Sequence, residues 1–268
     1  MSDLPWAARD LLTLLLAFGA GVLSGSFSMG GQVLMKPGIR ALGASPLGAV
    51  GTTVPMILPT VAMATYTYHR QGLVDWRAVR WAAPGGVIGA VAGSLLAPRV
   101  PGGGHLLQIV TAGLMLFTGL KMLRDGRRGA GSGDGRARPT TRDLPRPGGW
   151  ALVGTVSGMF SGLLGVGGGV IMVPAFSQVL GMSLISAIAT SLVCAGIFAI
   201  PATITHALLG TIEWRFALLL IVGAVPGARV GSRLAMRASD RRLEEAVGVM
   251  VTIIAIVYAA SEVSSLLR

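Results

Sequence analysis

A run of small residues in the second half of the chain has the composition of an anion-binding loop. Ser161 and Gly162 precede Gly167, Gly168 and Gly169. Glycine lacks a Cβ, so its backbone N–H can approach a ligand closely. A helix that begins after these glycines directs its unpaired amides and its positive dipole end toward the same point. Because such an arrangement binds anions without a basic side chain, we predict that these five residues contact an anion.

A second copy of this cluster lies 137 residues earlier, where it contains Ser24, Gly25, Gly30 and Gly31. In this copy Gln32 stands at the position of Gly169, and we expect it to contact the anion as well. Lys36, at the position of Val173, has two interpretations: it supplies a counter-charge to the anion, or it extends to the membrane surface. The glycines also have two interpretations, since small residues permit close packing of membrane helices. Duplication of the whole cluster favours a binding site.

The duplication extends well beyond the glycine clusters. Thr52 has a counterpart in Thr190, and the sequence 75–77 (Asp-Trp-Arg) has one in 213–215 (Glu-Trp-Arg), each 138 residues later. Further matching pairs are Gly85 and Gly223, Gly89 and Gly227, and Gly93 and Gly231. An apolar unit that occurs twice, with breaks at the same glycines, is typical of secondary transporters. The sequence therefore predicts two homologous halves.

The composition indicates a membrane protein and argues against a nucleic-acid-binding one. Lys and Arg number 22 against 11 Asp and Glu, a formal charge of +11, yet charged residues are only 12% of the chain and hydrophobic ones 52%. The mean hydropathy is +0.71. The basic residues cluster between apolar runs instead of lining one helix face. The single cysteine, Cys194, cannot form a disulfide within the chain or a thiolate metal cluster, and we predict no metal and no cofactor.

Eight apolar segments are long enough to enter or cross a membrane, which takes about 20 residues per helix. They are residues 10–42, 45–68, 79–97 and 105–123, followed by 149–180, 183–206, 216–235 and 243–261. The first segment of each half contains a glycine break. We expect an all-α, polytopic helix bundle, with a first membrane repeat over 1–123, a basic Gly/Pro-rich cytoplasmic linker over 124–148 and a second repeat over 149–268.

The broken first segment of each half has two alternative folds, and the topology depends on the choice. One long span would give four spans per half and parallel halves. A re-entrant hairpin of two short helices, followed by three spans, would give inverted halves. Basic residues collect on the cytoplasmic side of membrane proteins. With hairpins, 15 of the 22 basic residues fall on one side, including those at 233–242, and both termini lie outside. This distribution favours inverted halves.

Acidic residues are absent from the centres of the predicted spans. All 11 Asp and Glu lie in the termini, in loops or at span ends. Intramembrane carboxylates mark proton relays and acid–base catalysis, so their absence argues against both, and we predict that the protein is not an enzyme. The sequence also lacks the Gly-x4-Gly-Lys-Ser/Thr loop that binds nucleotide phosphates. An ATP-driven mechanism is therefore not expected.

The second glycine cluster and its neighbours resemble the signature of a known family. Gly158, Ser161, Gly162, Gly165, Gly167, Gly168, Gly169, Val173 and Pro174 are spaced as in the TauE/SafE sulfite exporter family (4-toluene sulfonate uptake permease-like membrane transporters). The length, the duplication and the basic linker are similar too. The resemblance implies export or uptake of small sulfur-containing or organic anions, such as sulfite, sulfoacetate and other sulfonates. The matching hydroxyl pairs 52–53 (Thr-Thr) and 190–191 (Thr-Ser), with Thr52 opposite Thr190, would hydrogen-bond a sulfonate oxygen, or else bond back to the preceding helical turn.

These observations predict a secondary anion transporter that crosses the cell (plasma or inner) membrane several times. We expect the anion near the bilayer midplane, between the two broken helices, with one half rocking against the other for alternating access. The expected partners are the anion, the lipid bilayer, a coupling proton or ion and a second copy of the chain, with no nucleic acid. Two alternatives remain: a membrane subunit that transports nothing, and an anion channel.

Overall fold

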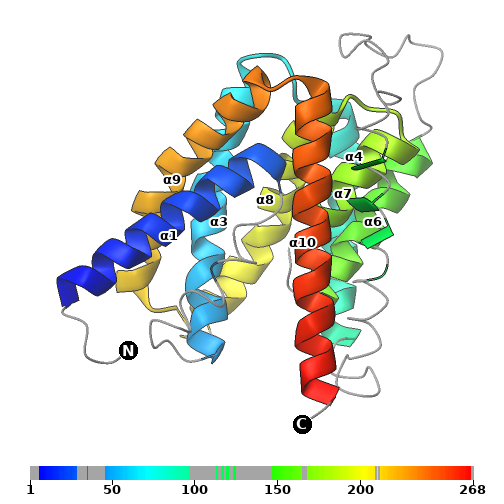
Figure 1. Ribbon diagram of the computed structural model, residues 1–268. Helices are drawn as coiled ribbons and strands as arrows, with labels where there is room; N and C mark the ends of the chain where they lie inside the picture. Colours follow the sequence, from blue (N-terminus) through cyan, green and yellow to red (C-terminus); the bar gives the residue numbers. More distant parts are fainter. Residues whose placement is uncertain are drawn as a thin grey trace.

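The part of the chain described by the computed structural model consists of helices and the turns between them, with no strand (Figure 1). This part comprises residues 6–28, 46–96, 147–164, 168–208 and 212–266, with the single residues 35, 113, 116, 117, 119, 120, 123, 124 and 210. The predicted all-α class is confirmed there. Among the described helices, three stretches are long and apolar enough to cross a membrane, namely Asp10–Phe27, Leu184–Pro201 and Trp214–Arg237.

The helices follow one another in the order expected from the apolar segments. The first half contains α1 (Trp6–Phe27), α3 (Pro46–His69) and α4 (Trp76–Leu96). The second half contains α6 (Pro147–Leu164), α7 (Gly169–Pro174), the π-helical turn η3 (Ala175–Val179), α8 (Leu184–Leu208), α9 (Trp214–Arg237) and α10 (Asp240–Leu266). By their place in the duplicated sequence, α1 corresponds to α6, α3 to α8 and α4 to α9. Most of the predicted linker 124–148 lies outside the described residues.

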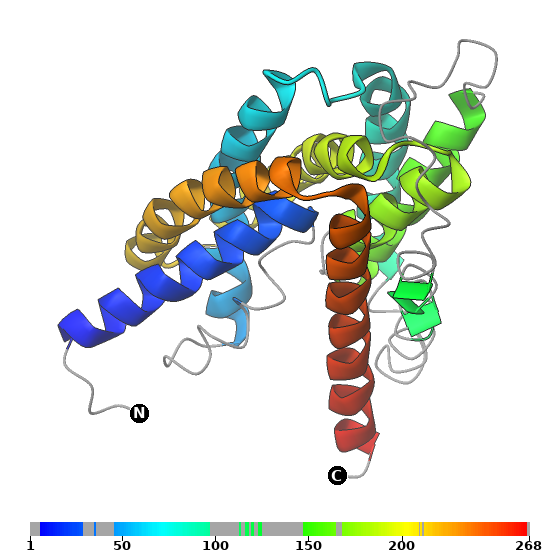
Figure 2. The same ribbon diagram turned by 45° about the horizontal axis from the view of Figure 1, so that its top comes forward.

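The first helix of each half packs against the third helix of the other half. α1 lies along α9, and α6 lies along α4 (Figures 1 and 2). A methyl group added at Gly21 of α1 would clash with the carbonyl oxygen of Ala224 in α9. At the corresponding place in the other pair, a methyl group at Gly158 would clash with the carbonyl oxygen of Gly86. Glycines therefore bring the helix backbones into direct contact, as small residues do in membrane bundles.

The corresponding helices α3 and α8 run in opposite directions. The N–H of Asp75, which follows the end of α3, donates to the hydroxyl oxygen of Thr190 near the start of α8, at 3.1 Å. Conversely, the N–H of Glu213, which follows the end of α8, donates to the hydroxyl oxygen of Thr52 near the start of α3, at 3.0 Å. Each helix therefore ends close to the point where the other begins.

The segment formed by α6, α7 and η3 folds back on itself. Trp150 lies in the first turn of α6, and Phe176 lies in η3, beyond the glycine break. Their rings pack edge to face with centroids 5.4 Å apart. The chain therefore enters along α6 and returns along α7 and η3 to the end where it began. The corresponding stretch of the first half, 29–45, lies outside the described residues except for residue 35.

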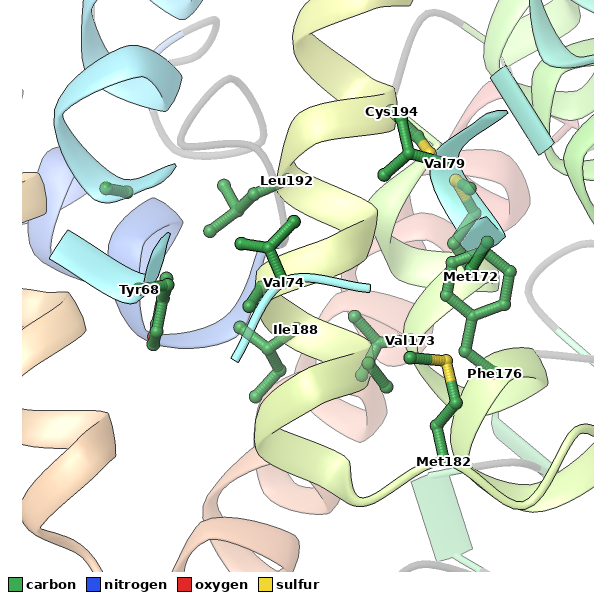
Figure 3. Close-up of a cluster of buried hydrophobic side chains, with 14 of the residues drawn as sticks. Tyr68, Val74, Val79, Met172, Val173, Phe176, Met182, Ile188, Leu192 and Cys194 are labelled. Atoms are coloured by element: carbon green, nitrogen blue, oxygen red, sulfur yellow. The ribbon is translucent and has the colours of Figure 1, made fainter. Parts of the chain in front are cut away.

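A buried apolar cluster fills the space around the first half of α8. On one side of this helix, Tyr68 and Val74 lie close to Ile188 and Leu192 (Figure 3). On its other side, where Cys194 of α8 lies, the cluster is continued by residues of α4, α7, η3 and the turn before α8, among them Val79, Met172, Val173, Phe176 and Met182. The cluster therefore joins the returning segment α7–η3 to the α3–α8 pair.

Replacing Gly21 with alanine should destabilise the protein, because the new methyl group would overlap the backbone of Ala224. Overpacking of this kind costs about 1–3 kcal/mol, which should lower the thermal midpoint of the protein measured in detergent. Gly19→Ala, on the same helix, is the matched control, since nothing lies within 4 Å of its added methyl group. Alanine favours helix by about 1 kcal/mol, so this control should keep or raise the midpoint. Equal losses in both variants would contradict the packing role.

Candidate functional site

The end of α1 has a strained backbone and lies inside the protein. Ser28, directly after α1, has a φ of 55°, a left-handed conformation that costs a non-glycine residue about 1–2 kcal/mol. Its N–H donates to the carbonyl oxygen of Ser24 at 2.9 Å. Its hydroxyl oxygen lies 2.8 Å from that of Ser191 on α8. Ser28 and Ser191 are both buried, so α1 stops in the interior, hydrogen-bonded to the other half of the chain.

The start of α7 touches the end of α1. A Cβ at Gly169, the first residue of α7, would overlap the carbonyl oxygen of Ser28 and lie 2.9 Å from its hydroxyl oxygen. Position 169 therefore requires glycine. Gly168 faces the ring of Phe198, whose nearest atom would lie 3.1 Å from an added Cβ. The end of the first broken element and the restart of the second thus meet, and we call this place, formed by Ser28, Gly169 and Ser191, the junction.

The junction offers hydroxyl and amide groups. The hydroxyl of Ser191 lies within hydrogen-bonding distance of both Ser28 and the Ile188 carbonyl oxygen, at 3.0 Å from the latter. Since a hydroxyl both donates and accepts, this pair can reorient toward a third group. The first backbone bonds of α7 run from Ile171 and Met172 to the carbonyl oxygen of Gly168. The amides before them have no acceptor inside the helix, and the dipole of α7 adds partial positive charge there.

The interior of the described region contains no ionised side chain. All of its buried polar side chains are hydroxyls, namely Thr13, Ser24, Ser26, Ser28, Thr52, Thr53, Thr60, Ser157, Thr190, Ser191 and Ser232. None of the Asp, Glu, Lys, Arg or His side chains that the structure describes is buried. Hydroxyls and amides can donate hydrogen bonds to an anion, whereas a dehydrated cation is usually held by several oxygen ligands, with carboxylates among them.

Apart from Gly25, Thr52 and Thr190, the predicted contact residues fall into three groups. Gly168 and Gly169 lie at the junction. Ser24 is buried in the last turn of α1, and Ser161 is half-buried in the last turn of α6, followed by Gly162. The remaining residues of the two glycine clusters, Gly30, Gly31, Gln32, Lys36 and Gly167, lie outside the described residues. Anion binding by all of them stays a prediction.

Gly25 has a packing role that the sequence offered only as the second interpretation. It lies within α1, and a Cβ there would clash with the carbonyl oxygen of Ala228 on α9. Its own carbonyl oxygen accepts a 2.7 Å hydrogen bond from the buried Tyr68 hydroxyl. Carbonyl oxygens in the last turn of a helix accept no hydrogen bond from an amide of the same helix. The Tyr68 hydroxyl therefore supplies a hydrogen bond to a carbonyl oxygen that would otherwise have no partner in lipid. Helix packing therefore leaves no room for a side chain larger than hydrogen at position 25.

Thr52 and Thr190 join the two halves of the chain. Each hydroxyl oxygen accepts a hydrogen bond from a backbone N–H of the other half, that of Glu213 for Thr52 and that of Asp75 for Thr190. The sequence suggested two roles for these hydroxyls: a hydrogen bond to a sulfonate, or a bond to the preceding helical turn. The observed bonds between the two halves correspond to neither role. Contact with an anion stays a prediction for both, since each hydroxyl retains a proton that it can donate.

Sequence reasoning did not include Ser28 among the contact residues, and it considered Ser191 only together with Thr190. Ser191 directly follows Thr190, and Ser28 belongs to the hydroxyl-rich run at 24–28. Composition thus marked both segments as polar within apolar surroundings. Which hydroxyl faces the other half depends on where α1 ends and on the left-handed turn at Ser28, and neither is encoded in residue spacing.

Over most of its length the chain is similar to proteins named as probable membrane transporters. The profile of the family described as sulfite exporter TauE/SafE matches residues 13–258. A probable membrane transporter protein of Xylella fastidiosa (strain 9a5c) is 30% identical over 246 residues, which are 90% of each chain. The probable membrane transporter protein YunE of Bacillus subtilis is 24% identical over 257 residues, 90% of this chain and 92% of its own.

A third relative is considerably longer than the chain. The probable membrane transporter protein MamO of Magnetospirillum gryphiswaldense is 30% identical over 273 residues, which are 87% of this chain but 41% of MamO. No solved structure matches the chain. The similarity therefore covers almost the whole sequence, and it concerns proteins named for membrane transport.

Substituting valine for Thr52 should destabilise the protein, because the N–H of Glu213 would lose its acceptor. An unsatisfied, partly buried donor costs about 1–3 kcal/mol, and the loss should appear as a lower thermal midpoint in detergent. Thr52→Ser keeps the hydroxyl and is the control; its midpoint should stay closer to that of the unchanged protein. A valine variant as stable as the serine variant would show that the bond contributes nothing.

Proposed function

This chain belongs to the TauE/SafE sulfite exporter family of membrane transporters, and from that premise we propose that it carries small anions, such as sulfite and sulfonates, through the junction. The observation that carries the proposal is the meeting of Gly169 with Ser28 beside the hydroxyl of Ser191. Backbone that interrupts a membrane helix is tolerated only where it faces protein or a water-filled cavity. The meeting of two such interruptions makes the junction the point where an anion would be held.

We further propose that the two halves are inverted repeats and that transport proceeds by alternating access. The opposite directions of the corresponding helices α3 and α8 support inversion, because parallel repeats would make them run in the same direction. The return of the chain from Trp150 to Phe176 supports a re-entrant hairpin as the first element of the second half. Inverted repeats whose broken helices meet at the midplane are a recurrent design of secondary transporters.

The distribution of basic residues supports an orientation in the cell membrane. Exposed arginines lie at the α3–α4 connection and at the α9–α10 connection, namely Arg70, Arg77, Arg80, Arg237, Arg241 and Arg242. Both connections lie at the upper end of the molecule in Figure 1, and the start of α1 and the end of α10 lie at the lower end. By the positive-inside rule the upper end faces the cytoplasm, which would make the protein a multi-pass inner-membrane transporter with both termini outside.

Removal of the Ser191 hydroxyl should weaken anion transport in proteoliposomes. A hydrogen bond to a charged group contributes about 1.5–3 kcal/mol, so Ser191→Ala should raise the half-saturating concentration of radiolabelled sulfite or sulfoacetate about 10- to 150-fold. Ser28→Gly should have a similar effect and removes the hydroxyl without adding strain, because glycine adopts a φ of 55° freely. Uptake should saturate with concentration, as expected for a carrier.

The matched control is Thr203→Val on the same helix as Ser191. The Thr203 hydroxyl donates to the carbonyl oxygen of Ala199 within α8, at 2.8 Å, and uptake by this variant should be unchanged. The anion should also raise the thermal midpoint of the unchanged protein, and less so that of Ser191→Ala. Wild-type uptake by both serine variants would place the anion elsewhere, and uptake that never saturates would indicate a channel.

A phosphatase that is active only outside the cytoplasm should be active when fused to the C-terminus in a bacterial host. Green fluorescent protein at the same place should remain dark, since it does not fold after export. Truncation after Arg237, at the end of α9, moves the fusion point across the membrane and should reverse both signals. A bright C-terminal fluorescent fusion would contradict the proposed orientation.

A further inference from the structure

The exchange of helices between the halves groups the bundle into two bodies that do not coincide with the halves. The first body consists of α1, α3 and α9, and the second of α6, α8 and α4. Each body thus takes two helices from one half of the sequence and the third from the other. The two bodies contain corresponding helices, because α1, α3 and α9 match α6, α8 and α4 in the duplicated sequence.

Within the first body, every pair of helices is joined by a hydrogen bond. The Ser26 hydroxyl of α1 donates to the carbonyl oxygen of Gly231 in α9, at 3.0 Å. The Tyr68 hydroxyl of α3 donates to the carbonyl oxygen at the end of α1, at 2.7 Å, and the N–H of Glu213 before α9 donates to Thr52 of α3. These bonds add to the glycine contacts along α1 and α9. The second half's helix α9 is therefore held firmly by the first half.

The second body repeats the glycine contacts of the first with the halves exchanged. A Cβ at Gly89 of α4 would clash with the carbonyl oxygen of Thr155 in α6, as one at Gly227 of α9 would clash with that of Phe18 in α1. α4 is joined to α8 by the bond from Asp75 to Thr190. The ring of Phe198 on α8 also packs directly on Gly86 of α4.

The described contacts between the bodies are made largely by small residues and apolar side chains. At the crossing of α3 and α8, an added Cβ on Gly196 would lie 2.8 Å from the Cγ1 of Val61. The junction adds the contacts of Ser28 with Ser191 and with Gly169. The buried apolar cluster around α8 lies across the same boundary, with Tyr68 on one side and Ile188 and Leu192 on the other. This boundary also contains the proposed anion site.

The chain crosses from one body to the other at two equivalent connections. The α3–α4 connection contains Gly72 with φ of 67°, and the α8–α9 connection contains Gly210, its sequence counterpart, with φ of 65°. Both glycines are exposed, and nothing lies within 4 Å of a Cβ built on either. Left-handed glycines in open surroundings can change their dihedral angles without displacing packed side chains. They have the properties of hinges that absorb movement between rigid parts.

We infer that the parts that move against each other during transport are these two mixed bodies, and that the connections at Gly72 and Gly210 are the hinges. The inference rests on the proposed alternating-access function. It differs from the expectation that one half of the sequence rocks against the other, because such a movement would have to break the glycine contacts of α1 with α9 and of α6 with α4.

Distances between spin labels on four exposed leucine and isoleucine positions distinguish the two movements. Leu15 on α1 and Leu218 on α9 belong to the first body, and Ile88 on α4 and Leu152 on α6 belong to the second. Pairs of cysteines at these positions, with the buried Cys194 changed to alanine, carry maleimide-linked labels. Distances are measured by double electron–electron resonance in liposomes with and without sulfoacetate, or with sulfite if only sulfite is taken up.

The mixed bodies predict that the pairs 15–218 and 88–152 keep their distances when the anion is added. The pairs 15–88 and 152–218, each within one half of the sequence, should shift by more than the width of the distributions of the first two pairs. The reverse pattern would overturn the inference in favour of rocking halves, and four unchanged distances in a protein that takes up the anion would overturn it as well. Absence of uptake by the unlabelled protein would instead refute the proposed transport.

Discussion

Helices in a membrane cannot recognise one another through the hydrophobic effect, because the surrounding lipid is as apolar as their side chains. Close contact between backbones takes its place here. Gly21 lies against Ala224 in one helix pair, and Gly158 lies against Gly86 in the other. These contacts determine which helices are neighbours, and they pair the first helix of each half with the third helix of the other. The remaining features of the bundle follow from that exchange.

One consequence is the position of the chain breaks. Bare amide and carbonyl groups are too costly in lipid to face it, so a broken helix must end against protein. Pairing of α1 with α9 and of α6 with α4 directs the end of α1 and the start of α7 toward the centre, where Ser28 meets Gly169. The cost of the left-handed backbone at Ser28 is offset by the bonds that its amide and hydroxyl make. A proposed anion site on such a junction uses groups that the fold has already placed out of the lipid.

The two halves share a frame but differ around the centre. Phe198 packs on Gly86, whereas its counterpart Thr60 bonds to the carbonyl oxygen of Met56 in its own helix. Tyr68, which binds the end of α1, has a histidine as its sequence counterpart. The glycines that hold the frame are repeated, while the residues near the junction are not. A site between two such halves presents different groups to the anion from each side, although the helices around it are arranged alike.

The sequence alone determined that the chain is a duplicated, helical membrane protein, since apolar length and repeated glycines are properties of composition and spacing. It placed helix ends well: the expected span 183–206 is observed as Leu184–Leu208, although α4 begins at Trp76 and not at residue 79. The sequence could not assign different roles to Gly25 and Gly169. A glycine that packs against a neighbouring helix and a glycine that packs against the end of a helix look identical in sequence. Only the tertiary structure decided that Thr52 and Thr190 accept bonds from the opposite half and that Ser28 and Ser191 meet. These contacts depend on how helices distant in sequence pair and cross, and that is fixed by packing in three dimensions.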